Sequence, residues 1–158
     1  MKIYVNRKYR TGPYGGGNHF IGAYFTRALE LEETKTWKHQ ICYPNDPKAV
    51  PDTFLVVGLD NDGTGLSIDQ IIYHKMMFNS RSKIVLRVNE NDAQKGTRDV
   101  DQKLLKISEM IDGTIFVSQW LHDHFMKLGW KCKNNTVIVN GVDREIFKPR
   151  GQTDGIAT

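Results

Sequence analysis

The residues best suited to chemistry in this sequence lie in two polar segments, and the first is rich in glycine. Residues 12–18 (GPYGGGN) stand between an expected strand and an expected helix. Glycines at such a junction let the backbone approach a ligand closely, and the free N–H groups at a helix start attract anions. We predict that this loop binds a phosphate or a sugar hydroxyl through Gly15, Gly16, Gly17 and Asn18. The alternative is a tight strand–helix turn without a ligand.

The second polar segment spans residues 86–97 (LRVNENDAQKGT) and follows another expected strand. Asn89, Glu90 and Asp92 can accept hydrogen bonds from sugar hydroxyls, and Arg87 and Lys95 suit a phosphate or a carboxylate. The carboxyl ends of parallel strands meet at one edge of a sheet, so both segments are expected at the same site. The alternative is a solvated loop that caps the following helix.

A third segment, residues 60–65 (DNDGTG), raises the question of a metal. Asp60 and Asp62 match the first positions of a calcium loop, but Ile71 stands where a bidentate glutamate is needed. A manganese site of a single-domain transferase stays open as an alternative. We prefer an ordinary turn rich in Asp and Gly, and predict no bound metal.

The glycine loop does not complete a dinucleotide-binding fingerprint. Gly15 and Gly17 supply its first two positions, but Phe20 replaces the third glycine, and no acidic residue closes the second expected strand directly. These departures argue against NAD or FAD as a cofactor.

The elements that must position these segments alternate between short β-branched runs and longer helical patterns. Strands are expected at residues 2–6, 40–43, 53–59, 83–88, 114–117 and 136–139, and helices at 18–31, 67–79, 99–111 and 118–128. Such alternation predicts an α/β fold, a Rossmann-like parallel sheet with helices on both faces. Three prolines between residues 44 and 51 predict an irregular crossing there.

Composition and charge are those of a globular α/β domain. The 158 residues are 39% hydrophobic and 25% charged, with a net charge of +4. The mild positive charge is compatible with anionic ligands or peripheral contact with an anionic membrane, and we predict no nucleic-acid partner. The start of the chain has no apolar signal core, so a cytoplasmic location is expected.

The segment at residues 136–149 (TVIVNGVDREIFKP) resembles the one that closes the amino-terminal domain in family 4 glycosyltransferases of the GT-B fold. Val117-Ser118 before a helix and the glycine loop at residues 13–17 are similar to further parts of that domain. The resemblance implies an acceptor-side domain at residues 1–149, with residues 150–158 a linker or the start of a missing carboxy-terminal domain.

The resemblance also implies what this domain does. It would hold a sugar or lipid-linked acceptor, while the carboxy-terminal domain, in cis or as a separate chain, would hold the nucleotide-sugar donor. The reaction would retain anomeric configuration without a bound metal or other cofactor in this chain. The family's Glu-x7-Glu signature is absent from these residues, so we expect the isolated chain to be inactive, and no catalytic residue is assigned. A lone Rossmann-type nucleotide-binding module and a metal-dependent transferase using Asp60 and Asp62 remain as alternatives.

Overall fold

A computed structural model describes residues 2–6, 40–42, 51–60, 65–78 and 81–140 of the chain, with main chain only for 40–42. The strands are β1 (Lys2–Val5), β2 (Gln40–Cys42), β3 (Thr53–Val56), β4 (Lys83–Val88), β5 (Gly113–Phe116) and β6 (Asn135–Val137). The helices are α2 (Ile68–Phe78), α3 (Asp92–Lys95), α4 (Val100–Ile107) and α5 (Gln119–Lys127). The helix expected at 18–31 and most of the crossing expected at 44–52 lie outside these residues.

The described strands form one parallel sheet in the order β2-β1-β3-β4-β5-β6. From β3 onward each strand pairs with the next strand along the chain, whereas β1 lies between β2 and β3. The order therefore reverses between β1 and β3, which is the topological switch point where open α/β sheets commonly bind ligands. The predicted α/β Rossmann-like fold is confirmed.

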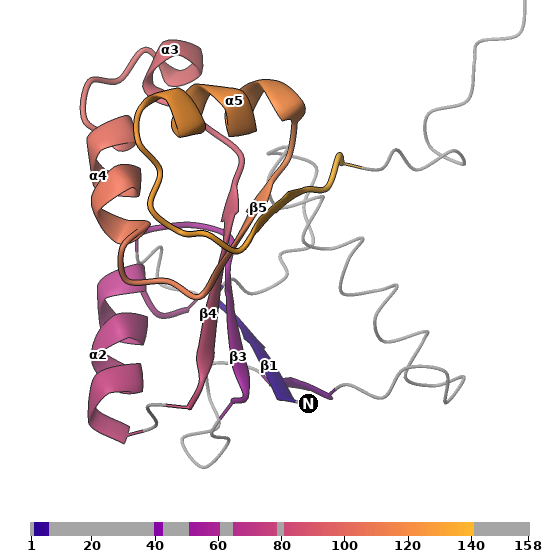
Figure 1. Cartoon of the computed structure of the whole chain (residues 1–158). Helices are drawn as coiled ribbons and strands as arrows, with labels where there is room; N and C mark the ends of the chain where they lie inside the picture. The colour runs from indigo at the N-terminus through magenta and orange to yellow at the C-terminus, as the bar shows by residue number, and fades with distance from the viewer. Residues whose placement is uncertain (1, 7–39, 43–50, 61–64, 79–80, 141–158) are drawn as a thin grey trace, which may run out of the picture.

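The hydrophobic core lies between the sheet and three of its helices. Alternate strand residues are buried. In β4, for example, Ile84, Leu86 and Val88 are at most 1% exposed, and the residues between them are partly exposed. Ile68 and Ile71 of α2, with residues of α4 and α5, join the same cluster. These helices therefore cover one face of the sheet, which Figure 1 shows nearly edge-on with α2 and α4 beside it.

Two helix starts follow the expected local chemistry. The backbone N–H of Ser67 donates to Gln70 Oε1 at 2.9 Å and that of Gln70 donates to Ser67 Oγ at 3.3 Å, which makes a capping box at the start of α2. Ser118 caps α5 by accepting the N–H of Leu121, and Gly129 follows that helix at φ +91°, a conformation that favours glycine.

Several boundaries differ from the sequence-based prediction: the strand expected at 53–59 ends at Val56, and the one expected at 136–139 ends at Val137. Two further differences have a clear local cause. The short helix α3 lies inside the segment expected to be a loop, because the Asn91 side chain caps its start and Gly96, at φ 67°, closes its end. Helix α4 ends at Ile107 and not at residue 111. The Ser108 hydroxyl donates to the carbonyl of Leu105 and accepts the N–H of Lys131, and these bonds end the helix.

Candidate functional site at the carboxyl edge of the sheet

The candidate site lies at the carboxyl edge of the sheet, where β4 and β5 lead into α3 and α5 (Figure 1). The second polar segment does lie at this edge. Its five predicted site residues, Arg87, Asn89, Glu90, Asp92 and Lys95, are all described. Gly15, Gly16, Gly17 and Asn18 lie outside the described residues, so the predicted meeting of the two segments stays a prediction.

Arg87 joins this edge to the end of the last strand. Its side chain alternates with the core residues Leu86 and Val88, so it projects from the other face of the sheet. Its Nη2 atom donates to Oδ1 of Asn140 at 2.7 Å, across 53 residues of sequence. Asn140 is the first residue of the Asn-Gly-Val-Asp motif. The polar segment after β4 and the motif after β6 are therefore directly in contact.

Within the polar segment, Glu90 and Lys95 form an ion pair with 2.5 Å between the charged atoms. Both side chains are partly exposed, and Asn89 beside them is exposed. Surface pairs of this kind contribute little to folding stability, so their charges are accessible to a ligand without much loss to the fold.

Asn91 is wholly buried and holds the segment in shape. Its Oδ1 atom accepts the N–H of Gln94 at 2.8 Å, whereas its Nδ2 atom has no hydrogen-bond partner. Asn91 was not among the predicted site residues, although an Asn before a short helix is a common cap.

Asp92 has a structural task that the sequence analysis missed. Its carboxylate accepts the Thr97 hydroxyl at 2.6 Å and the backbone N–H groups of Val100 and Asp101, so it caps the start of α4. The hydrogen bond from Thr97, followed by the backbone N–H groups, holds the pKa of Asp92 below its usual value. Asp99 stands at the expected cap position but makes no side-chain capping bond.

The same cap extends to α5 through Asp101. Asp101 accepts the backbone N–H of Asp92 with one oxygen and contacts His124 Nε2 at 2.8 Å with the other. The Trp120 ring stacks on His124 with an angle of 8° between the planes. His124 therefore joins the polar segment to α5, while the other histidine of α5, His122, contacts Asn135 of β6.

Asn6 fixes the switch point between β1 and β3, and sequence reasoning missed it. This residue is 0% exposed; its Nδ2 donates to the carbonyls of Gly58 and Leu66, and its Oδ1 accepts the N–H of Val57. The only sign of this role in the sequence was that Asn6, a polar residue, ends the expected strand at residues 2–6 ahead of the glycine loop. Gly65 packs so close that an added Cβ atom would lie 2.3 Å from the Asn6 carbonyl oxygen.

Asp60, one of the two carboxylates of the alternative metal site, forms an ion pair at the surface. The Asp60 carboxylate is 2.6 Å from Lys103 Nζ and is largely exposed, while Asp62 lies outside the described residues. Among the residues that the structure describes, no group of three His, Cys, Asp or Glu side chains could hold a metal ion.

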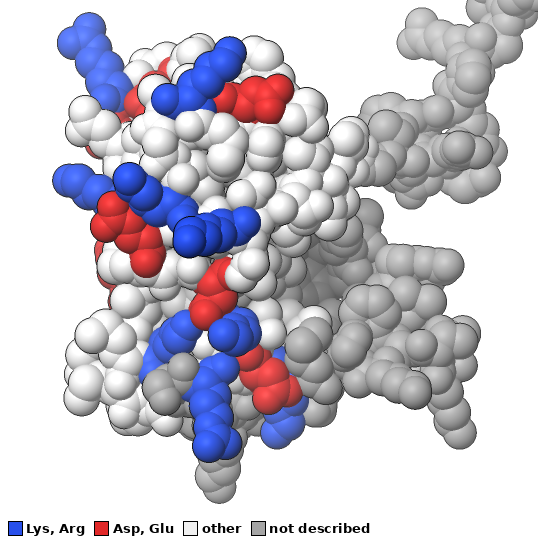
Figure 2. All heavy atoms as spheres, in the orientation of Figure 1, with Lys and Arg blue, Asp and Glu red and all other residues white. Residues whose placement is uncertain are grey.

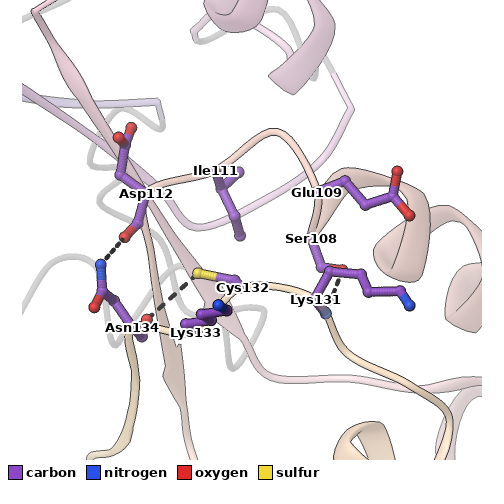
Figure 3. A pocket seen from close by; sticks show the side chains of 8 residues that line it. All are labelled: Ser108, Glu109, Ile111, Asp112, Lys131, Cys132, Lys133 and Asn134. Carbon is purple, nitrogen blue, oxygen red and sulfur yellow. Dashed lines mark hydrogen bonds between the residues drawn. The ribbon is translucent and has the colours of Figure 1, made fainter.

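A hollow lies at the opposite, amino edge of the sheet (Figure 3). It has a volume of about 470 Å³ and includes Ser108, Asp112, Cys132 and Asn134. These groups bond to the protein itself: Ser108 to Leu105 and Lys131, Asn134 to Asp112, and the free thiol of Cys132 to the Asn134 carbonyl. The hollow also includes the charged side chains of Glu109, Lys131 and Lys133. It lies at the amino edge, away from the edge where open parallel sheets commonly bind ligands, so it is not taken as the candidate site.

No protein-family model matches this chain, and no curated protein matches it either. None of the helices in the described part is both long and apolar enough to cross a membrane.

Proposed function

We propose that this chain is the acceptor-side domain of a two-domain glycosyltransferase of the GT-B type. The observation that carries the proposal is the hydrogen bond between Arg87 and Asn140. It brings together, at one edge of a parallel sheet, the polar segment and the motif by which the sequence resembles family 4 enzymes. Ligands of open parallel sheets bind at that edge.

In this proposal the polar segment holds the acceptor. Asn89 and Glu90 accept hydrogen bonds from sugar hydroxyls, while Lys95 and Arg87 favour a negatively charged group such as an acceptor phosphate. Asp92 does not contact the acceptor directly, since its carboxylate accepts hydrogen bonds at the start of α4. It holds the backbone of the polar segment in the conformation that binds the acceptor. The glycine loop with Gly15, Gly16, Gly17 and Asn18 completes the site, and the chain works in the cytoplasm.

Transfer then depends on a carboxy-terminal domain that binds the nucleotide-sugar. The acceptor-side domain positions the acceptor hydroxyl, and orientation of this kind can supply a large part of a rate enhancement. The sugar passes to the acceptor as its bond to the diphosphate breaks, with charge on the leaving phosphate stabilised across the cleft. No residue of the described part is assigned as a general base.

The test is an acceptor-dependent transfer assay on the 158-residue chain alone and on a protein that joins it to a donor domain encoded downstream. We expect transfer only with the second protein. In that protein, Arg87→Gln should lower transfer about 10- to 100-fold, since a contact to a charged group is worth about 1.5–3 kcal/mol. Arg98→Gln, which removes an exposed arginine directly after that segment, is the matched control.

Two results contradict the proposal. Turnover of a nucleotide-sugar by the isolated chain would show that no donor domain is required. A downstream reading frame without Glu-x7-Glu about one domain later would mean that the donor domain required by the proposal is not encoded there.

The second candidate function is a nucleotide-binding module without transferase activity. The switch point between β1 and β3, where Asn6 ties two loops together, favours it. Calorimetry of the isolated chain with UDP, GDP and ADP separates the two, because the proposed acceptor-side domain should bind these nucleotides weakly or not at all.

A further inference from the structure

The carboxyl-terminal half of α2 exposes four large apolar side chains. The exposed fractions are 60% for Tyr73, 76% for Met76, 60% for Met77 and 70% for Phe78. We call this group the α2 apolar end. Folded domains rarely leave such a cluster in water, and clusters of this kind mark surfaces that contact a partner or a membrane.

The pattern along α2 shows that this surface is not part of the core-facing stripe. Ile68 and Ile71 turn inward and are 0% exposed. Tyr73, Met76 and Met77 follow the i, i+3, i+4 spacing of a single helix face and point outward. The last turns of α2 thus present an apolar face that the core does not cover.

Basic residues surround the α2 apolar end at the amino edge of the sheet. Arg81 and Lys83 follow the helix along the chain, and Lys75 lies within it. Lys75 and Lys83 share one carboxylate, that of Asp112. Figure 2 shows basic side chains with acidic ones between them at this end of the molecule, next to a surface without charged atoms. The described charged residues of this edge are Lys2, Lys75, Arg81, Lys83, Lys131 and Lys133 against Asp52, Glu109 and Asp112.

We propose that the α2 apolar end inserts into the surface of an anionic lipid bilayer. Aromatic and methionine side chains would enter the boundary between headgroups and acyl chains, and the surrounding cations would attract anionic headgroups. The excess of basic residues argues against a second copy of this chain as the occupant. A symmetric dimer would set the same basic residues against each other. The proposal stands independently of the glycosyltransferase function.

The test is flotation of the full chain with vesicles of phosphatidylcholine alone and of phosphatidylcholine mixed with phosphatidylserine. We expect binding to the mixed vesicles that weakens as salt is raised. The variant Met76→Ser/Met77→Ser/Phe78→Ser should reduce the vesicle partition coefficient about tenfold or more, because it removes the inserted apolar groups. The variant Arg81→Gln/Lys83→Gln should reduce binding to the mixed vesicles only.

The matched control is Met110→Ser/Leu128→Ser, which removes two exposed apolar side chains elsewhere, 47% and 45% exposed. It should bind vesicles like the original chain, and circular dichroism should show that every variant is folded. Unchanged vesicle binding by the triple serine variant overturns the proposal. It is also overturned if that variant abolishes a dimer seen by sedimentation, or a complex with another protein, while vesicles are not bound at all.

Discussion

Arg87 and Asn140 are joined by a 2.7 Å hydrogen bond although β5 lies between their strands. Arg87 is aligned with Ile115 of β5, which is in turn aligned with Thr136 of β6. The guanidinium of Arg87 therefore extends past β5 to Asn140, which lies beyond the end of β6. This contact ties the chain that leaves β6 to the centre of the sheet. Asn140, the last residue that the structure describes, is therefore held in place by β4.

A double-mutant cycle on Arg87→Ala and Asn140→Ala should reveal this coupling. We expect an interaction free energy of about 1 kcal/mol, below the usual 1.5–3 kcal/mol for a bond to a charged group because both residues are partly exposed. Urea unfolding of the two single variants and the double variant measures it. Strictly additive losses would mean that the bond does not form in solution.

Asn6→Ala should be among the more destabilising substitutions in the chain. It leaves the carbonyls of Gly58 and Leu66 and the N–H of Val57 without the partner they now have, at a cost of about 3 kcal/mol. Thermal and urea unfolding test this, with Asn134→Ala as the control because that amide is exposed. Equal losses for the two variants would contradict the tethering role of Asn6.

Gly65→Ala should disrupt the same region through a steric clash. The new methyl group would lie 2.3 Å from the Asn6 carbonyl oxygen and 2.7 Å from its carbon, and backbone atoms cannot turn aside as a flexible side chain can. We expect a loss of about 2 kcal/mol or more in the free energy of unfolding. Gly113→Ala is the comparison, since its nearest neighbour would be a Val85 methyl group at an ordinary 3.5 Å.

The Asp112 carboxylate should make folding stability depend on acid pH. Burial alone would raise its pKa, but hydrogen bonds from Lys75, the Ile84 N–H and Lys83 outweigh burial and lower it. Because the folded-state pKa is below the unfolded value of about 3.9, the stabilisation is present above that pH and is lost as pH falls through the folded-state pKa.

Asp112→Asn should therefore lower the melting temperature at pH 7 and reduce its fall between about pH 4 and pH 2. Differential scanning calorimetry across that range measures both effects. Asp69→Asn, which changes an exposed carboxyl on α2, should leave the pH profile of melting close to that of the original chain.

Asp92→Ala should lower the melting temperature, whereas Asn89→Ala should leave it nearly unchanged. The first variant removes the acceptor for Thr97, Val100 and Asp101, and the second changes an exposed side chain. If both variants lose acceptor binding, the melting temperatures separate an effect on shape from the loss of a direct contact. A fully stable Asp92→Ala variant would mean that α4 starts without this cap.

The sequence predicted the fold well wherever local pattern decides structure. Strand β4 has the expected bounds, residues 83–88, because its core side is marked by Ile84, Leu86 and Val88. The short helix α3 escaped prediction, since four residues carry no periodicity and only its caps define it. Helix α4 ended early for a reason that lies 23 residues away, where the Lys131 N–H meets Ser108.

The candidate site was predictable in position and less so in the role of each residue. A parallel sheet places the polar segment at the carboxyl edge whatever its side chains do, and Arg87 to Lys95 lie there. Whether a carboxylate faces a ligand or a helix start depends on tertiary contacts, as Asp92 shows with its bonds to α4. Asn6 was missed for the same reason. The hydrogen-bond partner of its side chain that is nearest in sequence, the backbone N–H of Val57, is 51 residues along the chain.

The position of β1 between β2 and β3 has a consequence for synthesis on the ribosome. The first strand to emerge has partners that come much later, since Lys2 aligns with Gln40 and Ile3 with Thr53. From β3 to β6, in contrast, each strand finds its neighbour in the next strand to be made. The edge of β1 that pairs with β3 must therefore stay unpaired until Phe54 and Leu55 have left the exit tunnel, even if β2 has already paired with the other edge. Slow translation of the codons before β3 would prolong the time for which that edge is exposed. A chaperone that binds the amino terminus would protect the exposed edge from aggregation during that time.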